Sequence, residues 1–272
     1  MKISKKTMIS AGAFIIPGLL FASSAFAASS AATQLITKVT QGNAKIIKSF
    51  PAIANLEGFV VGPTKGQGQK TIIYADKDGK YMVAGALIGP NGQNITQTDF
   101  AKYVTAKMMP KIFANVQKTS WIQQGNAKAP HKAYILVEPN CIACHMLYKG
   151  LKAQIKSGQL AVRWVFLAFL KPSSLGQAAA IIQSNDPAKA FAMDEKNFND
   201  KTETGGIAPT KNIDAATKQK IQANMKFMTA SNFIGTPVII YKDSKGEPQV
   251  VKGFIPGKAL QKTIAGMSGN WS

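Results

Sequence analysis

Both cysteines of this 272-residue chain stand three residues apart, in the pentapeptide Cys-Ile-Ala-Cys-His at positions 141–145. A disulfide between them closes a loop too short to remove much conformational entropy from the unfolded chain, whereas stabilising disulfides join distant segments. A structural bridge is therefore a poor explanation for the pair. We predict that Cys141 and Cys144 form a redox-active disulfide whose chemistry is the function of the protein.

The residues around the pair predict a strand followed by a helix. Residues 133–138 are mostly apolar and have strand character. After the pair, apolar residues recur at helical spacing: Leu147, Tyr148, Leu151 and Ile155. Cys141 therefore starts a helix, where unpaired N–H groups and the helix dipole lower a thiol pKa below its free value of about 8.5. We expect Cys141 to be the exposed nucleophile and Cys144, one turn further in, to be the resolving thiol.

Two other chemistries share parts of this motif. Cys-x-x-Cys-His is also the attachment signature of c-type haem, with His145 as the iron ligand. The motif is short, however, and here it follows a predicted strand in an α/β pattern, which favours a dithiol. Zinc binding would need His131, which stands at the opposite end of that strand. We expect no metal, and we interpret His145 as a solvated first-turn residue that modulates the nearby thiols.

Residues 1–27 have the layout of a secretory signal peptide: a basic start, an apolar middle and a small-residue cleavage site at 25–27. The apolar stretch is too short for a comfortable membrane span, and a Pro-Gly pair interrupts it. No later segment approaches that length. We expect an exported mature protein with no membrane span.

The sequence is strongly basic, and removal of the signal peptide leaves 30 basic against 13 acidic residues, a net charge of +17. Such an excess is typical of proteins that meet acidic partners, nucleic acid or anionic membranes. Arg163 is the only arginine, however, and the lysines are scattered, whereas phosphate recognition usually recruits the guanidinium group. We expect no nucleic-acid partner and interpret the charge as an aid to solubility and steering.

The mature chain is long enough for two domains. The first, residues 28–95, shows one helical pattern and three strand patterns. The expected elements are a helix over 33–50 interrupted at 42–43, strands at 59–61, 71–75 and 80–88, and a hairpin turn at 76–79. A domain of this size buries little core alone, so we expect it to oligomerise.

Residues 96–120 are predicted to be a helical linker between the domains, with a packed surface helix of a single domain as the alternative. Apolar residues follow helical spacing from 99 to 116. Thr98 is the candidate cap, and Pro110 is expected to kink the helix.

Residues 121–272 are predicted to form the second domain. The Cys-x-x-Cys helix ends near residue 158, and residues 160–170 are nearly continuously apolar, as in a strand buried on both faces. The remaining expected elements are a helix opened by Asp186-Pro187, a helix capped by Asp214, strands at 238–241 and 249–254, and a last helix from about residue 258. This order is that of a thioredoxin fold.

With this order in place, the chain resembles the periplasmic thioredoxin-fold disulfide isomerases of the DsbC/DsbG family, and most closely its DsbG branch. The stretches that carry the resemblance are 138–144, 170–172, 178–182, 185–190 and 235–237, with looser matches at 78–80 and 120–121. The resemblance implies an α+β protein: a thioredoxin-like domain with a helical insertion, joined by the helical linker to a small cystatin-like N-terminal domain that forms a homodimer. It also implies that Pro237 is a cis-proline facing the dithiol and that the backbone of Thr236 pairs with a substrate strand.

The chain departs from the family pattern in two respects. Ile142 and Ala143 replace the proline and aromatic residue usual between the cysteines, and this dipeptide modulates thiol pKa and redox poise. The strong positive charge is the second departure, because the family cleft is rather acidic.

The expected function is thiol:disulfide interchange in the periplasm. The reduced dithiol, with no cofactor besides its own disulfide, isomerises or reduces disulfides, or reduces sulfenic acids, on exported proteins. A membrane thiol reductase of the DsbD type is expected to re-reduce it. The alternatives are a net dithiol oxidase, a chaperone that uses an apolar cleft, and the c-type haem protein described above.

Overall fold

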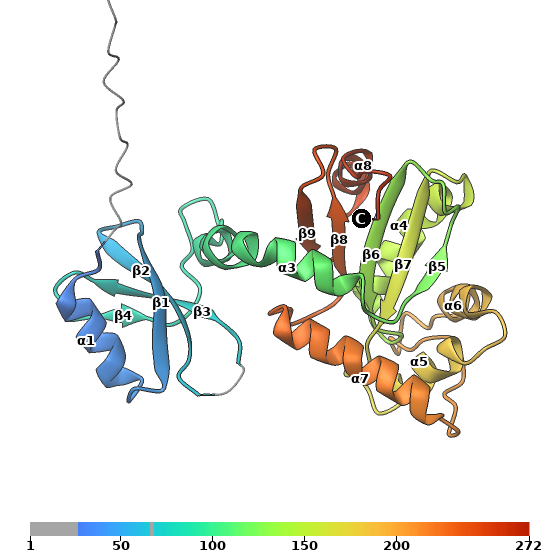
Figure 1. Cartoon of the computed structure of the whole chain (residues 1–272), viewed down its shortest axis with the longest axis horizontal. Helices are drawn as coiled ribbons and strands as arrows, with labels where there is room; N and C mark the ends of the chain where they lie inside the picture. The colour runs from blue at the N-terminus through green and yellow to red at the C-terminus, as the bar shows by residue number, and fades with distance from the viewer. Residues whose placement is uncertain (1–26, 66–67, 272) are drawn as a thin grey trace, which may run out of the picture.

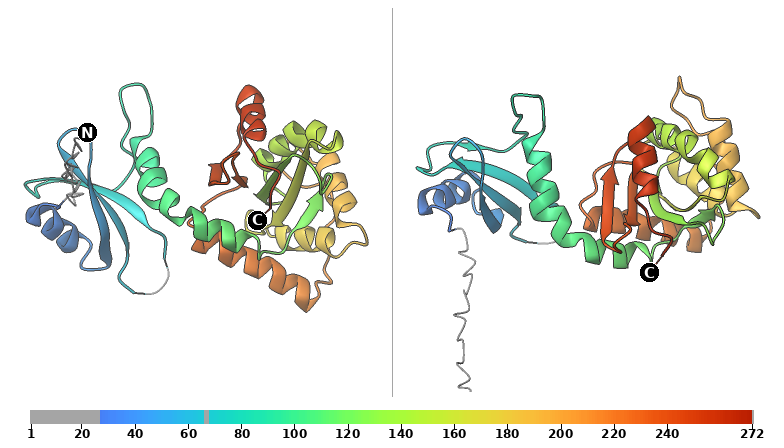
Figure 2. Two further views of the ribbon diagram at one scale, coloured as in Figure 1. Left: turned by 45° about the horizontal axis from the view of Figure 1, so that its top comes forward. Right: turned by 90° about the horizontal axis from the view of Figure 1, so that it is seen from above.

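The computed structural model describes residues 27–65 and 68–271, which form two sheets joined by a long helical connection (Figure 1). The first sheet has the strand order β1-β2-β3-β4, and the second has the order β5-β7-β6-β8-β9. The helical connection holds the two sheets apart, which gives an elongated molecule (Figure 2). Among these residues, no helix combines the length and apolar character needed to cross a membrane. The predicted signal peptide lies outside them, apart from its last residue.

The first sheet is antiparallel, and both of its faces are covered. Its strands are β1 (Ala44–Pro51), β2 (Leu56–Pro63), β3 (Thr71–Asp76) and β4 (Met82–Val83). Helix α1 (Ser30–Val39) packs Ile36 against Phe59 and Ile73 on one face. On the other face Tyr74 packs near Val104 of the helical connection. The side chains of successive β3 residues thus pack on opposite faces of the sheet, as strand geometry requires.

The predicted helix over 33–50 is wrong in its second half. Helix α1 ends at Val39, and Gly42 then takes a left-handed conformation (φ 71°) that glycine adopts without strain. Ile46 and Ile47 belong to β1, because pairing with β2 and β-branched side chains favour a strand there.

In this half the turn of the predicted hairpin is correct, but its second strand is shorter in the structure than predicted. The turn is confirmed, since the Gly79 N–H donates to the Asp76 carbonyl at 3.1 Å. The predicted strand at 80–88 reduces to the two residues of β4 and an isolated bridge at Ile88.

The connection between the sheets runs through α2 (Ile95–Phe100), a π-helical turn (Ala101–Thr105) and α3 (Ala106–Val116). Asn94 caps α2 by accepting the Gln97 N–H at 2.9 Å, so the prediction of Thr98 as the cap is wrong by one turn. Met109, Ile112 and Phe113 of α3 join the core of the second half. The predicted domain boundaries remain predictions.

The second half has a mixed five-stranded sheet. Its strands are β5 (Ile122–Gln124), β6 (His131–Val137), β7 (Leu160–Phe166), β8 (Val238–Lys242) and β9 (Pro248–Lys252). Its helices are α4 (Ile142–Lys156), α5 (Ser174–Ile182), α6 (Pro187–Lys196), α7 (Ala215–Ala230) and α8 (Gly257–Ala265). Strand β6 pairs in parallel with β7 and antiparallel with β8. Helices α4, α5, α6 and α8 cover one face, and α3 with the end of α7 covers the other.

The helix starts predicted in the insertion between β7 and β8 are confirmed. Asp186 caps α6 by accepting the Lys189 N–H, with Pro187 at the first helical position, and Asp214 caps α7. Strand β7 ends at Phe166, four residues earlier than predicted. The mixed sheet, the Cys-x-x-Cys helix after β6 and the helical insertion agree with the predicted thioredoxin fold.

Candidate active site

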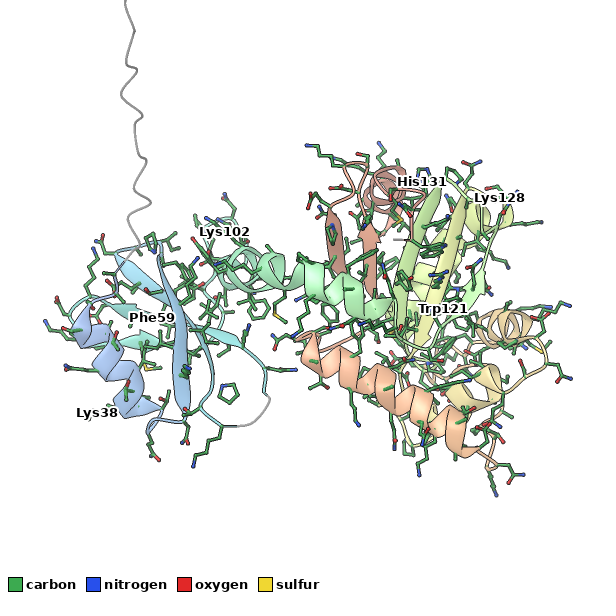
Figure 3. All side chains as sticks on the ribbon, viewed as in Figure 1. Lys38, Phe59, Lys102, Trp121, Lys128 and His131 are labelled. Carbon is green, nitrogen blue, oxygen red and sulfur yellow. A yellow bond between two sulfur atoms is a disulfide. The ribbon has the colours of Figure 1, made fainter. Side chains whose placement is uncertain are left out.

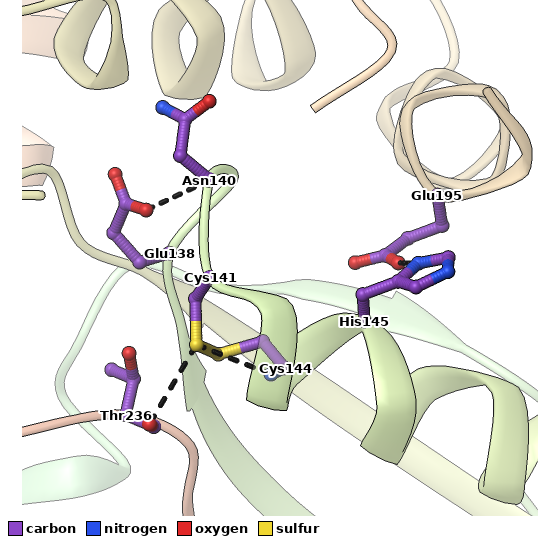
Figure 4. The surroundings of a disulfide bond; sticks show 7 residues. All are labelled: Glu138, Asn140, Cys141, Cys144, His145, Glu195 and Thr236. Carbon is purple, nitrogen blue, oxygen red and sulfur yellow. Dashed lines mark hydrogen bonds and ion pairs between the residues drawn. A yellow bond between two sulfur atoms is a disulfide. The ribbon is translucent and has the colours of Figure 1, made fainter. Parts of the chain in front are cut away.

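The dithiol lies where β6 gives way to α4. Cys141 is the N-cap residue of α4, in extended conformation, and it is joined to Cys144 by a disulfide (Figure 4). The Cys141 Sγ accepts a hydrogen bond from the Cys144 backbone N–H at 3.1 Å. In the reduced protein this N–H and the helix dipole stabilise negative charge on Cys141 Sγ. The predicted position of Cys141 at a helix start is confirmed.

The prediction that Cys141 is exposed is wrong for the oxidised protein. Cys141 is 6% exposed and Cys144 is 1% exposed. The loop before β8 covers the dithiol, because the Thr236 carbonyl oxygen lies 3.6 Å from the Cys141 Sγ (Figure 4). Cys141 still has the larger exposed fraction of the two residues, and Cys144 is the more buried one, as expected.

Thr236 and Pro237 form the loop that faces the disulfide. The peptide bond between them is cis, which confirms the predicted conformation. The pairing of β6 with β8 ends at Leu136 and Val238, so Thr236 lies just beyond the ladder. Its backbone is therefore placed at the end of the sheet, beside Cys141. The roles of the two residues in substrate binding remain predictions.

Ile142 and Ala143 occupy the first turn of α4 between the two cysteines. Both are partly buried, and Ala143 packs against the main core of the domain. Their predicted influence on the redox poise remains a prediction.

His145 is buried, with 6% of the residue exposed, so its interpretation as a solvated residue is wrong. Its Nδ1 lies 2.7 Å from the Glu195 Oε2, and its Nε2 lies 3.5 Å from the Asp200 Oδ1. Its ring stacks on Phe198, with the centroids 4.4 Å apart and the planes 9° from parallel. Figure 4 shows the side chain directed at α6 and away from the disulfide. The helical insertion supplies all three partners, and the sequence pattern did not show that it packs against His145.

This arrangement differs from the haem and zinc alternatives. Both ring nitrogens of His145 face carboxylates, and the two sulfurs are bonded to each other. His131 lies at the far end of β6, where its Nδ1 is 2.8 Å from the Met267 carbonyl oxygen (Figure 3). No group of three or more metal-ligating side chains occurs in the described part of the chain.

Three buried carboxyl groups lie behind the dithiol, and the sequence analysis missed all of them. Glu138 accepts the Asn140 N–H at 2.7 Å, and burial raises the pKa of its carboxyl. Burial also raises the pKa of Asp194 to about 7, and the charges of Glu195 and Glu138 add to this increase. Burial raises the pKa of Glu195 as well, against the opposing effect of the hydrogen bond with His145. Asp194 therefore exchanges its proton close to neutral pH, and all three raised pKa values lie near a site whose chemistry needs thiolates.

Asn140 connects the turn before Cys141 to the helical insertion. Its Nδ2 donates to the Ser174 Oγ at 3.0 Å, and its Oδ1 accepts the Gly205 N–H at 3.1 Å. A Cβ at Gly205 would lie 2.5 Å from the Asp194 Oδ1, so only glycine allows this close approach. The insertion thereby fixes the loop that carries the nucleophile.

A sequence signal for two of the missed residues does exist. Asp194 and Glu195 follow Phe191 by three and four positions, which places them on the same face of α6 as this buried ring. Acidic residues at core positions of a helix indicate a buried polar site.

Comparisons with known proteins agree with this geometry. Residues 117–267 match the thioredoxin-like domain family, and the chain belongs to that family. The chain is 27% identical to the thiol:disulfide interchange protein DsbG of Pseudomonas aeruginosa over 218 residues, which cover 80% of this chain and 82% of the relative. It is 26% identical to DsbG of Escherichia coli, over 79% of this chain and 84% of the relative.

Among solved structures, the catalytic domain of Proteus mirabilis ScsC is similar, with a TM-score of 0.47 and 14% identity over 59% of this chain and 96% of that one. The family match and the two DsbG relatives define the type of protein. The chain is a DsbC/DsbG-like thiol:disulfide interchange protein.

Proposed function

We propose that the protein isomerises or reduces disulfides on exported proteins in the periplasm, in its reduced form. The observation that carries the proposal is Cys141 at the N-cap of α4, bonded to a more buried Cys144 and facing the Thr236 carbonyl. A helix-start thiol that accepts a backbone N–H is the natural attacking group, and an adjacent buried thiol is the natural resolving group.

The first step is an attack of the Cys141 thiolate on one sulfur of a substrate disulfide. A bond forms between Cys141 and that sulfur, and the other substrate sulfur leaves as a thiolate. In isomerisation a second substrate thiolate then attacks the mixed disulfide, which returns Cys141 reduced and leaves the substrate with a new bridge. In reduction Cys144 attacks Cys141 instead, and the substrate leaves with both thiols reduced. A substrate sulfenic acid reacts in the same way, with water as the leaving group.

Thr236 and Pro237 orient the substrate in this proposal. Thr236 lies beyond the last pair of the β6 and β8 ladder, so an extended substrate strand can pair with its backbone. The protein needs no cofactor other than its own disulfide. Each reductive cycle consumes two electrons, which a membrane thiol reductase of the DsbD type supplies.

The first half of the chain is proposed to form a homodimer. Its four-stranded sheet is small, and several large apolar side chains near it are exposed: Val39, Ile53, Tyr81, Val83 and Ile88. A second copy that covers such side chains removes apolar surface from water. Export by the signal peptide at residues 1–27 places the dimer in the periplasm.

The thiol state in intact cells tests the direction of electron flow. Acid quenching followed by alkylation with a mass-tagged reagent should show mostly reduced Cys141 and Cys144 if the protein acts as isomerase or reductase. A mostly oxidised pair would instead support the net oxidase. Light scattering of the mature protein tests the assembly, and a monomer at micromolar concentration would contradict the proposed dimer.

A further inference from the structure

The two halves of the chain are joined directly beside the loop that faces the dithiol. The side-chain amide of Asn232 accepts the Lys70 backbone N–H at 3.0 Å and donates to the Lys70 carbonyl oxygen at 3.1 Å. Asn232 has a left-handed backbone (φ 59°), which asparagine tolerates better than most residues. It stands four residues before Thr236. The first half therefore contacts the segment that leads to the active-site loop.

An open groove between the two halves lies on both sides of this contact. One compartment, with a volume of about 560 Å³, is lined by residues from β3, α2, β9 and the segment 232–234. The other, of about 860 Å³, is lined by residues from β1, α3 and α7. Lys70 lines both compartments, and we call the two together the interdomain groove.

The groove combines apolar side chains with positive charge that no acid balances. In the smaller compartment the charged side chains are Lys70 and Lys252, and Lys45, Lys111 and Lys226 join Lys70 in the larger one. The described lining contains no aspartate or glutamate. The Lys252 Nζ lies 5.0 Å from the centre of the Phe100 ring, and partial desolvation lowers the pKa of this lysine although it remains open to solvent.

Ile234 lies in the groove and close in sequence to the loop beside the reacting sulfur. It is 82% exposed, lines the smaller compartment and stands two residues before Thr236. An extended chain advances about 3.3 Å per residue. A substrate strand that pairs beside Thr236 therefore reaches Ile234 and the neighbouring lysines within a few residues of the cysteine that reacts with Cys141.

We propose that the interdomain groove binds an acidic and apolar flanking segment of the client protein, and so selects clients whose disulfides lie next to such a segment. The inference rests on the proposed function, and it assigns a role to the strong positive charge of the chain. Apolar residues of the client pack on Ile234 and Val250, and its carboxylates pair with Lys70 and Lys252. Nucleic acid fits this groove less well, because the described lining holds no arginine.

The test uses the reduced full-length protein and two matched peptides. Each peptide carries one cysteine as a mixed disulfide with a chromophoric aromatic thiol; glutamates and leucines flank it in one, and glutamines replace the glutamates in the other. The readout is the ratio of the two rates of chromophore release. We expect the acidic peptide to react about tenfold faster at low salt, with the advantage lost at high salt, because steering by charge is screened.

Charge variants show whether the groove is responsible. Lys70→Gln combined with Lys252→Gln should bring the ratio close to one. The matched control, Lys38→Gln with Lys128→Gln, removes the same charge at the outer ends of the molecule and should keep the wild-type ratio (Figure 3).

Three results would overturn the inference. In the first the wild-type protein reacts with the two peptides at equal rates, and in the second the control variant loses the rate ratio as fully as the groove variant does. The third result is a wild-type rate ratio near one together with single-stranded DNA binding that only the groove variant weakens. A wild-type protein that reacts with neither peptide would instead contradict the proposed function itself.

Discussion

Replacement of Asp194 by asparagine should change how the stability of the protein depends on pH. Asp194 is fully buried, and its Oδ1 accepts the Ile207 N–H at 2.9 Å. Its Oδ2 has no hydrogen-bond partner among the described residues. Burial is the main cause that raises the pKa of this carboxyl from 3.8 to about 7.

The magnitude follows from the difference between the folded and unfolded pKa values. A rise of about three units corresponds to about 4 kcal/mol. The folded protein binds this proton more tightly than the unfolded chain, so the contribution is fully present below about pH 4. It is lost as the pH rises to about 7, and the free energy of unfolding falls over this window. Asparagine resembles the neutral acid and cannot ionise, so Asp194→Asn removes this part of the pH dependence.

Urea denaturation of the oxidised protein between about pH 5 and pH 8.5 measures the effect. At pH 5 the variant should be less stable than the wild type by about 1–3 kcal/mol, because the amide buries two N–H donors where the neutral acid buries one O–H donor. The difference should shrink or reverse by pH 8.5. Asp78→Asn is the control, since it removes a carboxylate that is 72% exposed, in the hairpin turn of the first half, and should leave the contribution of Asp194 unchanged. A wild-type minus Asp194→Asn difference that is constant over this pH range would refute the reasoning.

Three further predictions concern the thiols and the core. In the reduced protein, alkylation of Cys141 should titrate well below pH 8.5 while Cys144 reacts slowly, and a free-thiol midpoint at Cys141 would argue against its activation at the helix start. Arg163→Ala should lower the free energy of unfolding by about 2 kcal/mol in urea denaturation, because the guanidinium lies 4.0 Å from the ring centres of both Trp121 and Trp271; an unchanged midpoint would mean that this stacking contributes nothing. Protein made together with a cytochrome c maturation system should carry no covalent haem, and a haem-stained product would overturn the dithiol assignment.

Local patterns predicted the site better than they predicted the first domain. The strand, the Cys-x-x-Cys pair and the helix after it follow from short-range signals, and so do the caps Asp186 and Asp214. The spacing predicts a helix for residues 44–50 because Ile46 and Ile47 fit either period. These residues form a strand because they pair with β2, and local spacing does not reveal this pairing.

Local sequence patterns did not predict which residues surround the dithiol. His145 is buried because α6, some 50 residues further along the chain, places Glu195 against it. Asn140 is likewise fixed by Ser174 and Gly205. The cis conformation at Pro237 was predicted from family resemblance, since few X-Pro bonds are cis. Contacts across the insertion set the environment of the thiols. Spacing within α6 can mark Asp194 and Glu195 as buried acids, but it does not reveal which residues they contact.

Trapping of mixed disulfides tests the central claim most directly. In Cys144→Ala the resolving thiol is absent, so substrates that Cys141 attacks should remain covalently attached to it. Purification from acid-quenched cells should give a ladder of exported proteins that dithiothreitol releases. The matched Cys141→Ala variant should give none. The account would be contradicted if Cys144→Ala formed no mixed disulfides, or if Cys141→Ala formed as many.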